Sequence, residues 1–219
     1  MTDLFSKEAI EAVCQELGYK KGWTFFTCPE DRLESPRAVL VGLNPGGGGV
    51  QDKSEYGGVW DCPNNDYFFG QWLVKAGEAK MQREVQAWYE LLGLQHDETV
   101  AAQWTPFRSS RWHTLADQEK AQNMSRALWA ELITRTPAKL YLAMGQVAGS
   151  GVASLLNAKL DPSELPTGWG KTTIKIYNAP DGRRVVQLPH PSSFRILTRD
   201  ADRSDKARQS FLKATKGYL

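Results

Sequence analysis

Two polar side chains stand directly after short apolar segments of the kind that form buried strands. Asn44 follows residues 38–41 and is flanked by glycine and proline, and His190 follows residues 184–188 and is flanked by two prolines. In α/β proteins the loops at strand ends meet in a crevice, and ligands bind there. The sequence therefore predicts that Asn44 and His190 are two halves of one site.

The two side chains suit a reaction whose leaving group departs as an anion. The Asn44 amide does not titrate near neutral pH, but it can position a water molecule. His190 has restricted backbone freedom and can donate a hydrogen bond to a developing negative charge. Hydrolysis of the glycosidic bond of a nucleobase fits this pair. Neither segment carries the paired carboxylates of sugar hydrolases, and the chain has no P-loop, GxSxG or dinucleotide fingerprint.

The sequence between these residues predicts alternating strands and helices. Apolar runs predict strands at residues 38–41, 99–104, 140–144, 172–177 and 184–188, of which the last two read as a hairpin around Pro180-Asp181-Gly182. Apolar periodicity and capping residues predict helices at residues 7–17, 65–76, 85–92, 117–135, 146–156 and 201–216. This order indicates an α/β fold with a mostly parallel sheet, helices on both faces and a late β-hairpin.

Length and composition favour one domain in a reducing compartment. The chain has 219 residues, a net charge of +2 and three scattered cysteines without a CxxC pair. These cysteines argue against a disulfide framework and cannot supply a four-thiolate cluster, although one disulfide pair stays open. Signal-peptide and membrane-spanning patterns are absent. We therefore expect a cytoplasmic monomer with no membrane association, no cofactor and no metal.

The two motifs resemble those of the uracil-DNA glycosylase superfamily, especially its mismatch-specific uracil/thymine branch and its single-strand-selective branch. Gly42-Leu43-Asn44-Pro45-Gly46 is similar to the first active-site motif, in which the Asn orients the attacking water. His190-Pro191-Ser192 is similar to the second motif, in which classical uracil enzymes place a His against the uracil O2. The mismatch branch has Asn there, so this chain combines an Asn first motif with a His second motif.

The resemblance covers most of residues 38–195. It includes Trp60-Asp61-Cys62-Pro63, similar to the loop whose aromatic stacks on the flipped base, and Trp169-Gly170-Lys171-Thr172, similar to a turn of the mismatch branch. It implies a single domain over residues 1–219, with a three-layer α/β/α arrangement around a four-stranded, mostly parallel sheet. Residues 1–35 lie outside the resemblance and are expected to form a helical N-terminal extension.

The resemblance also implies roles for individual residues. Asn44 and His190 would be catalytic, and Gly42, Leu43, Trp60 and Gln103 would bind the base. Contacts to DNA would come from Gly46, Gly47, Lys171, Ser192, Ser193, Phe194 and Arg195. Phe194 would enter the space left by the flipped base, and Arg199 would add to salt-dependent affinity. Gln103 stands where the family has an Asn, so the identity of the base is less secure than the class of reaction.

The expected function is therefore that of a DNA glycosylase, which extrudes uracil or a related deaminated base and leaves an abasic site in base excision repair. Two alternatives stay open. A non-catalytic DNA-binding protein of the same fold would explain Gln103, and an enzyme acting on a free nucleoside would explain the low net charge. Residue roles also stay open, because Trp60 could instead be a core aromatic in a chain with eight tryptophans, and Phe194 could pack under the last helix.

Overall fold

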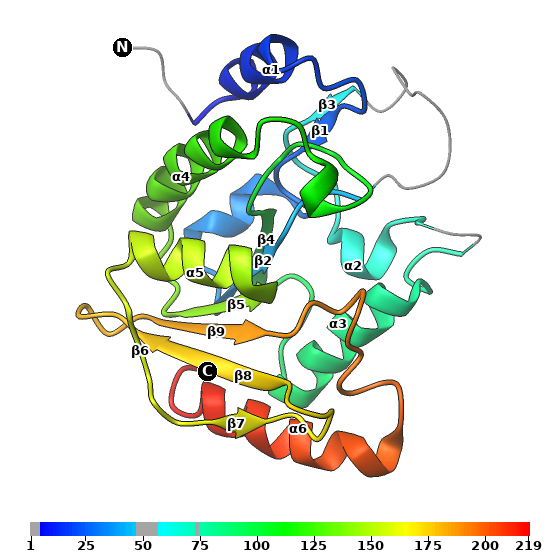
Figure 1. Cartoon of the computed structure of the whole chain (residues 1–219), viewed down its shortest axis with the longest axis vertical. Helices are drawn as coiled ribbons and strands as arrows, with labels where there is room; N and C mark the ends of the chain where they lie inside the picture. The colour runs from blue at the N-terminus through cyan, green and yellow to red at the C-terminus, as the bar shows by residue number, and fades with distance from the viewer. Residues whose placement is uncertain (1–4, 47–56, 73–74) are drawn as a thin grey trace.

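A mixed β-sheet with helices packed around it forms the body of the protein (Figure 1). The structure is a computed structural model and describes residues 5–46, 57–72 and 75–219. The predicted α/β class is confirmed. Within the described residues, no helix combines the length and the apolar character needed to cross a bilayer.

Four strands of the sheet run parallel to one another and carry the two motifs. The sheet order is β4 (Thr99–Gln103), β2 (Ala38–Gly42), β5 (Leu140–Met144), β9 (Arg184–Leu188), β8 (Thr173–Asn178) and β6 (Lys159–Leu160). The pairs from β4 to β9 are parallel, whereas β8 is antiparallel to β9 as the predicted hairpin requires. Every residue of β2, β4 and β5 is buried, as expected for strands covered on both faces.

The helices pack on the sheet and on one another. Their bounds are α1 (Lys7–Glu16), α2 (Asp66–Phe69), α3 (Lys80–Leu92), α4 (Gln118–Arg135), α5 (Gly145–Leu155) and α6 (Ala201–Thr215). In Figure 1, α4 and α5 lie on one side of the sheet and α3 and α6 on the other. Buried side chains from all these layers form one continuous hydrophobic cluster. Local capping supports the prediction, because Ser6, Asn65 and Asp117 each accept a backbone hydrogen bond at the start of a helix.

The helix predicted at residues 65–76 is much shorter than expected. It starts after Asn65 but ends at Phe69, because Gly70 has extended backbone with φ −68° and ψ 133°. A side chain at Gly70 would also collide with Asp66, so the turn there requires glycine. Conversely, α3 begins at Lys80, five residues before the predicted start.

The N-terminal segment is more than the helical extension that we predicted. After α1, β1 (Trp23–Thr24) pairs in parallel with β3 (Gly58–Val59), and Phe26 forms a bridge with Ala102 of β4. The side chains of Trp23, Phe25, Phe26 and Cys28 are fully buried in the common core. Sequence reasoning missed these pairings because two-residue strands carry no periodicity.

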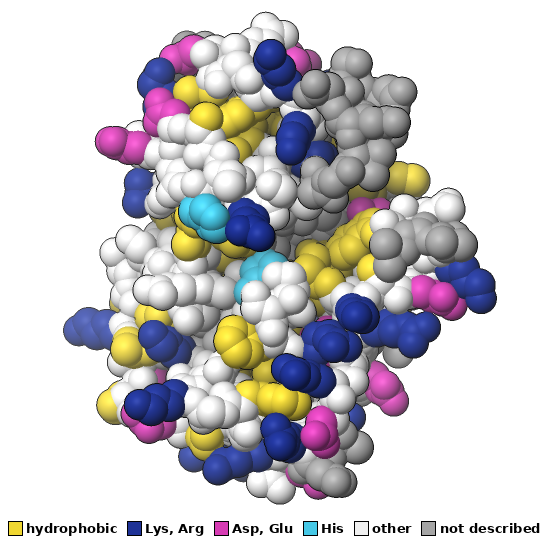
Figure 2. All heavy atoms as spheres, turned by 45° about the vertical axis from the view of Figure 1, so that its right-hand side comes forward, with side chains coloured by type: hydrophobic (Ala, Val, Ile, Leu, Met, Phe, Trp, Pro, Cys, Tyr) yellow, Lys and Arg dark blue, Asp and Glu magenta, His cyan; other side chains and the backbone are white. Residues whose placement is uncertain are grey.

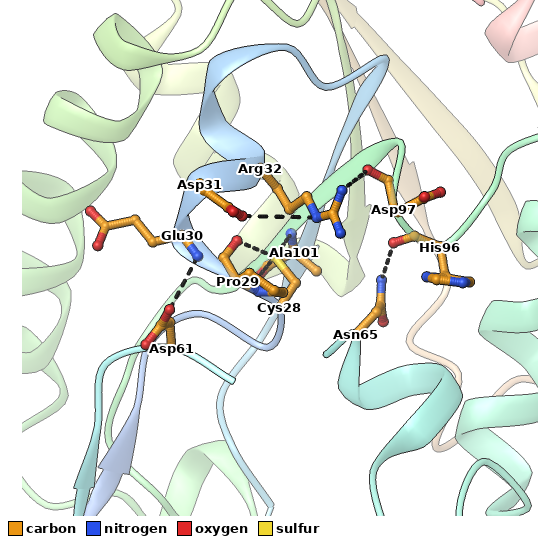
Figure 3. A network of polar contacts seen from close by, with 10 residues as sticks. All are labelled: Cys28, Pro29, Glu30, Asp31, Arg32, Asp61, Asn65, His96, Asp97 and Ala101. Atoms are coloured by element: carbon orange, nitrogen blue, oxygen red, sulfur yellow. Dashed lines mark hydrogen bonds and ion pairs between the residues drawn. The ribbon is translucent and has the colours of Figure 1, made fainter. Parts of the chain in front are cut away.

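A polar network joins this segment to the loops around β4 and α2 (Figure 3). In it, the Arg32 guanidinium donates to the carbonyl of Asp97, and the Ala101 amide donates to the Cys28 sulfur. The Asn65 amide donates to the carbonyl of His96 while its oxygen caps α2. These bonds hold α2 against the loop that precedes β4, and α2 in turn carries Tyr67 to the ends of the central strands.

Candidate active site

The carboxyl ends of β4, β2, β5 and β9 bring Asn44 and His190 to the same edge of the sheet. Val41 of β2 stands opposite Ala143 of β5, and Met144 stands opposite Leu188 of β9. Neighbouring strands lie about 4.8 Å apart, so β2 and β9 are separated by roughly 10 Å across β5. This spacing places the two motifs on either side of the turn from β5 into α5.

Backbone hydrogen bonds join the segment that carries Asn44 to the segment that follows β4. The amides of Trp104, Thr105 and Ser109 donate to the carbonyls of Gly42, Leu43 and Pro45. Both chains therefore continue side by side beyond the ends of their strands. This ladder fixes the backbone of the first motif, and Leu43 and Asn44 are left only partly buried at its end.

The Asn44 side chain is held in one orientation. Its Nδ2 donates to the carbonyls of Pro45 at 3.0 Å and Ser109 at 3.3 Å, and to the Ser109 hydroxyl at 3.0 Å. Carbonyl oxygens only accept hydrogen bonds, so the amide nitrogen must be the atom that faces them. The Oδ1 atom therefore points the other way, and no described residue donates to it. Asn44 thus offers a fixed acceptor, which is the group that orients a water.

The His190 ring is held in one tautomer. Its Nδ1 accepts from the Ser192 amide at 3.3 Å and lies 2.8 Å from the Ser192 hydroxyl. A backbone N–H can only donate, so Nδ1 carries no proton in the neutral ring and Nε2 carries it. Burial lowers the pKa of His190 to about 4. At neutral pH the ring is therefore an uncharged donor through Nε2–H.

Gly145, the first residue of α5, lies against the His190 ring. Its φ is +84°, and a Cβ built there would lie 3.4 Å from the His190 Cβ and 3.6 Å from Cδ2. The glycine lets the chain turn sharply from β5 into α5 and lets the histidine ring lie close against the backbone. Gly145 therefore presents backbone, without a side chain, beside the His190 ring.

Gln103 ends β4 and lies over the end of β2. A Cβ on Gly42 would be 2.3 Å from the Gln103 Oε1, so the amide lies directly across the glycine. The side chain is 5 % exposed, and Oε1 has no hydrogen-bond partner among the described residues. Burial raises the pKa of Tyr67, and a hydrogen bond with the Gln103 side chain opposes that shift. Along the edge the order is thus Gln103, Asn44, Gly145 and His190.

The structure places Trp60, predicted to stack on the base, in an aromatic cluster of the core. Its ring packs 5.2 to 5.5 Å from those of Phe5, Phe25 and Phe26, and its Nε1 donates to Glu30. The Trp60 carbonyl accepts from the Phe26 amide, and Phe26 bridges Ala102 of β4. Within the described residues, no hydrogen bond or ring contact joins Trp60 to Asn44 or His190. The pairing of β3 with β1 draws the tryptophan into this cluster.

The residues predicted to touch DNA are placed differently from one another. Ser192, Ser193, Phe194 and Lys171 are exposed and Arg195 is half-buried, and the Ser192 hydroxyl lies against the His190 ring. Phe194 is 43 % exposed, so it does not pack under the last helix. Gly46 is exposed and accepts a hydrogen bond from Arg108, and Gly47 lies outside the described residues.

Glu84 is a buried positioning residue that sequence reasoning missed. From α3 it accepts hydrogen bonds from the amides of Leu197 and Thr198, the Thr198 hydroxyl and the indole of Trp88, at 2.8 to 3.1 Å. Glu84 has no exposed surface. It anchors the segment that begins at His190, and its position in an amphipathic helix gave no signal of that contact.

Basic side chains surround an aromatic residue near the His190 segment. The guanidinium carbons of Arg199 and Arg203 lie 5.0 and 5.4 Å from the ring centre of Trp169. We call Trp169, Lys171, Arg199 and Arg203 the tryptophan patch. Figure 2 shows lysine and arginine side chains gathered in the lower half of this face, below a histidine at its centre.

Comparison with protein families and with curated proteins gives no relative. No family model matches the chain, and no curated protein matches it. In the described part of the chain, no three His, Cys, Asp or Glu side chains are grouped so that they could hold a metal ion.

Proposed function

We propose that this protein is a DNA glycosylase, which hydrolyses the N-glycosidic bond of uracil or a related deaminated base and leaves an abasic site. One observation carries the proposal. A fixed acceptor, Asn44 Oδ1, and an uncharged donor, His190 Nε2–H, stand at the same sheet edge on either side of Gly145. The parallel order β4-β2-β5-β9 also fits the four-stranded, three-layer fold of the superfamily that the motifs resemble.

The chemistry follows from the two groups. Asn44 Oδ1 would accept a hydrogen bond from a water and direct its oxygen at C1′ of the sugar. As the O–C1′ bond forms, the N–C1′ bond breaks and its electron pair leaves with the base. The His190 N–H would stabilise the resulting base anion, and the proton lost by the water passes to solvent. A neutral donor suits this step, because its proton stays in place while the negative charge develops.

Gln103 would meet the edge of the base. Its buried Oε1 lacks a partner, and an unpaired buried acceptor costs roughly 1–3 kcal/mol. The ring N–H of a base would satisfy it once the Gln103 amide turned out of its contact with Gly42. This requirement favours bases such as uracil and hypoxanthine over those without a ring N–H on that edge.

A base-release assay tests the proposal. The wild-type protein is incubated with oligonucleotides that contain uracil, hypoxanthine, xanthine or a thymine mismatch, and abasic sites are cleaved and resolved on a gel. We expect release from at least one substrate and a loss of about 100-fold or more in Asn44→Ala and His190→Ala, as for other electrostatic groups in hydrolases.

The controls are Asn123→Ala and His113→Ala, which change the same residue types at exposed positions. They should release base at the wild-type rate. Binding to the same DNA without release from any of these substrates would instead support a non-catalytic DNA-binding protein. Turnover of free deoxyuridine at a rate equal to that of the oligonucleotide would support a nucleoside hydrolase.

A further inference from the structure

A basic hollow adjoins the first motif on the side away from His190. It has a volume of about 370 Å³ and is formed by two loops that are far apart in sequence. Its lining is Gly18, Tyr19, Lys20, Lys21, Arg108, Ser109, Ser110, Thr114, Leu115 and Ala116. We call it the lysine hollow. Nothing in the proposed catalytic step uses it.

The hollow shares a wall with the catalytic amide. Ser109 lines the hollow, and its carbonyl and hydroxyl hold the Asn44 side chain. Arg108, next to it, donates to the carbonyl of Gly46, the last described residue of the first motif. A ligand in the hollow would therefore lie beside Ser109, which holds the side chain that positions the attacking water.

The charges of the hollow are available to an anion. Neither Lys20 nor Lys21 forms an ion pair with a described residue, in contrast to Lys120, which pairs with Glu16 at 2.8 Å. Asp117, the acidic residue beside the rim, accepts from the Lys120 amide as the cap of α4. Ser110 adds an exposed hydroxyl that can donate. Ammonium groups and hydroxyls are the side-chain groups that bind phosphate oxygens in protein–DNA complexes.

We infer that the lysine hollow binds backbone phosphates of the DNA strand on one side of the target nucleotide, while the tryptophan patch contacts the strand on the other side. The inference rests on the proposed function for the identity of the ligand. The two basic regions flank Asn44 and His190, so one strand that crosses the site would touch both. A DNA strand would then bind much more tightly than a free nucleoside. The low net charge of the chain is compatible with DNA binding, because the basic side chains are clustered locally.

The test is the salt dependence of binding to a single-stranded oligonucleotide that contains no target base. Lys20→Ala/Lys21→Ala should weaken binding about tenfold at low salt and reduce the slope of log K against log salt by about 1.4, since each phosphate contact on a single strand contributes about 0.7. Lys20→Arg/Lys21→Arg keeps the charge and should restore both values.

The matched control is Lys139→Ala/Lys159→Ala, which removes the same charge at exposed positions before β5 and on β6. An equal loss in this control, or an unchanged slope in the Lys20/Lys21 variant, would overturn the inference. Inorganic phosphate that binds the hollow without competing with the oligonucleotide would overturn it too.

The outcomes separate the two proposals. If the lysine variant loses affinity but the wild-type protein releases no base, the hollow is a DNA site and the proposed reaction is wrong. If base is released and the lysine variant binds like wild type, the reaction stands and the hollow is not a strand site.

Discussion

The two halves of the candidate site are held by different physical means. The Asn44 half extends a ladder of backbone hydrogen bonds between the chains that leave β2 and β4. Beside the His190 half no strand continues, because α5 begins directly after β5. That loop is closed by the amides of Ser193 and Phe194 on the His190 carbonyl and anchored by Glu84.

This difference locates the vulnerable points of the site. The stability of the Asn44 half is distributed over several backbone hydrogen bonds, which substitutions other than proline leave in place. The anchor of the His190 half concentrates four donors on one buried carboxylate. Damage to the second half should therefore need only one substitution, whereas the first half should tolerate most single changes.

Glu84→Ala should have the largest effect. It leaves the amides of Leu197 and Thr198 and the Trp88 indole without an acceptor in the interior, and we expect a loss of about 3 kcal/mol or more in the free energy of unfolding. Urea denaturation measures it. Glu90→Ala, exposed on the same helix, is the control and should change stability by less than about 0.5 kcal/mol. Equal midpoints for the two variants would refute the anchoring role.

Gly145→Ala should come next. At φ +84° an alanine is strained by roughly 1–2 kcal/mol, and relief of that strain would shift the backbone that is in van der Waals contact with the His190 ring. Gly217→Ala is a matched control, because φ is +83° there but no atom of the described residues lies within 4 Å of the added Cβ. Both variants should lose similar stability in denaturation, but Gly145→Ala alone should slow base release. Equal rates would show that His190 does not depend on this contact.

Ser109→Ala and Ser192→Ala compare the two halves directly, with smaller effects. Each removes a serine hydroxyl that hydrogen-bonds to a catalytic side chain. A backbone partner remains in each case: the Ser109 carbonyl for Asn44 and the Ser192 amide for His190. We expect each to slow base release by about fivefold, equivalent to roughly 1 kcal/mol. Ser150→Ala, exposed on α5, should have no effect. A much larger loss in one variant would show that its backbone partner does not orient the side chain.

At neutral pH the titration of His190 should not affect stability, and its effect should appear only in acid. Because burial lowers its pKa from 6.5 to about 4, the unfolded chain takes up a proton that the folded protein does not between these values. Stability should therefore fall as pH falls from 6.5 to about 4. His190→Gln should remove this part of the slope in thermal denaturation at a series of pH values. An unchanged slope would mean that the ring titrates normally.

Several elements follow from local sequence because their signals are local. The strands that end before Asn44 and His190 are runs of apolar residues, and Ser6, Asn65 and Asp117 mark helix starts through hydrogen bonds within one turn. The hairpin between β8 and β9 follows from its turn residues. These features depend on neighbours in the chain, so the sequence contains what is needed to predict them.

Other features depend on contacts between distant segments. Trp60 resembles a stacking residue in its motif, but the pairing of β3 with β1 places it among Phe5, Phe25 and Phe26. In the sequence, Glu84 is one of many acidic residues on predicted helices. Its role comes only from the packing of α3 beside the segment that follows His190. Periodicity carries no information on either contact.

The sequence by itself determined the α/β class, the strands that end at Asn44 and His190, and the residue types at those ends. Only the tertiary structure decided which atoms of these side chains stay available: Oδ1 of Asn44, because carbonyls of Pro45 and Ser109 occupy Nδ2, and Nε2–H of His190, because Ser192 occupies Nδ1. The reason is physical. Residue type sets the groups a side chain has, but the conformation of its own loop and the partners that the fold brings to it set which of those groups are free to act.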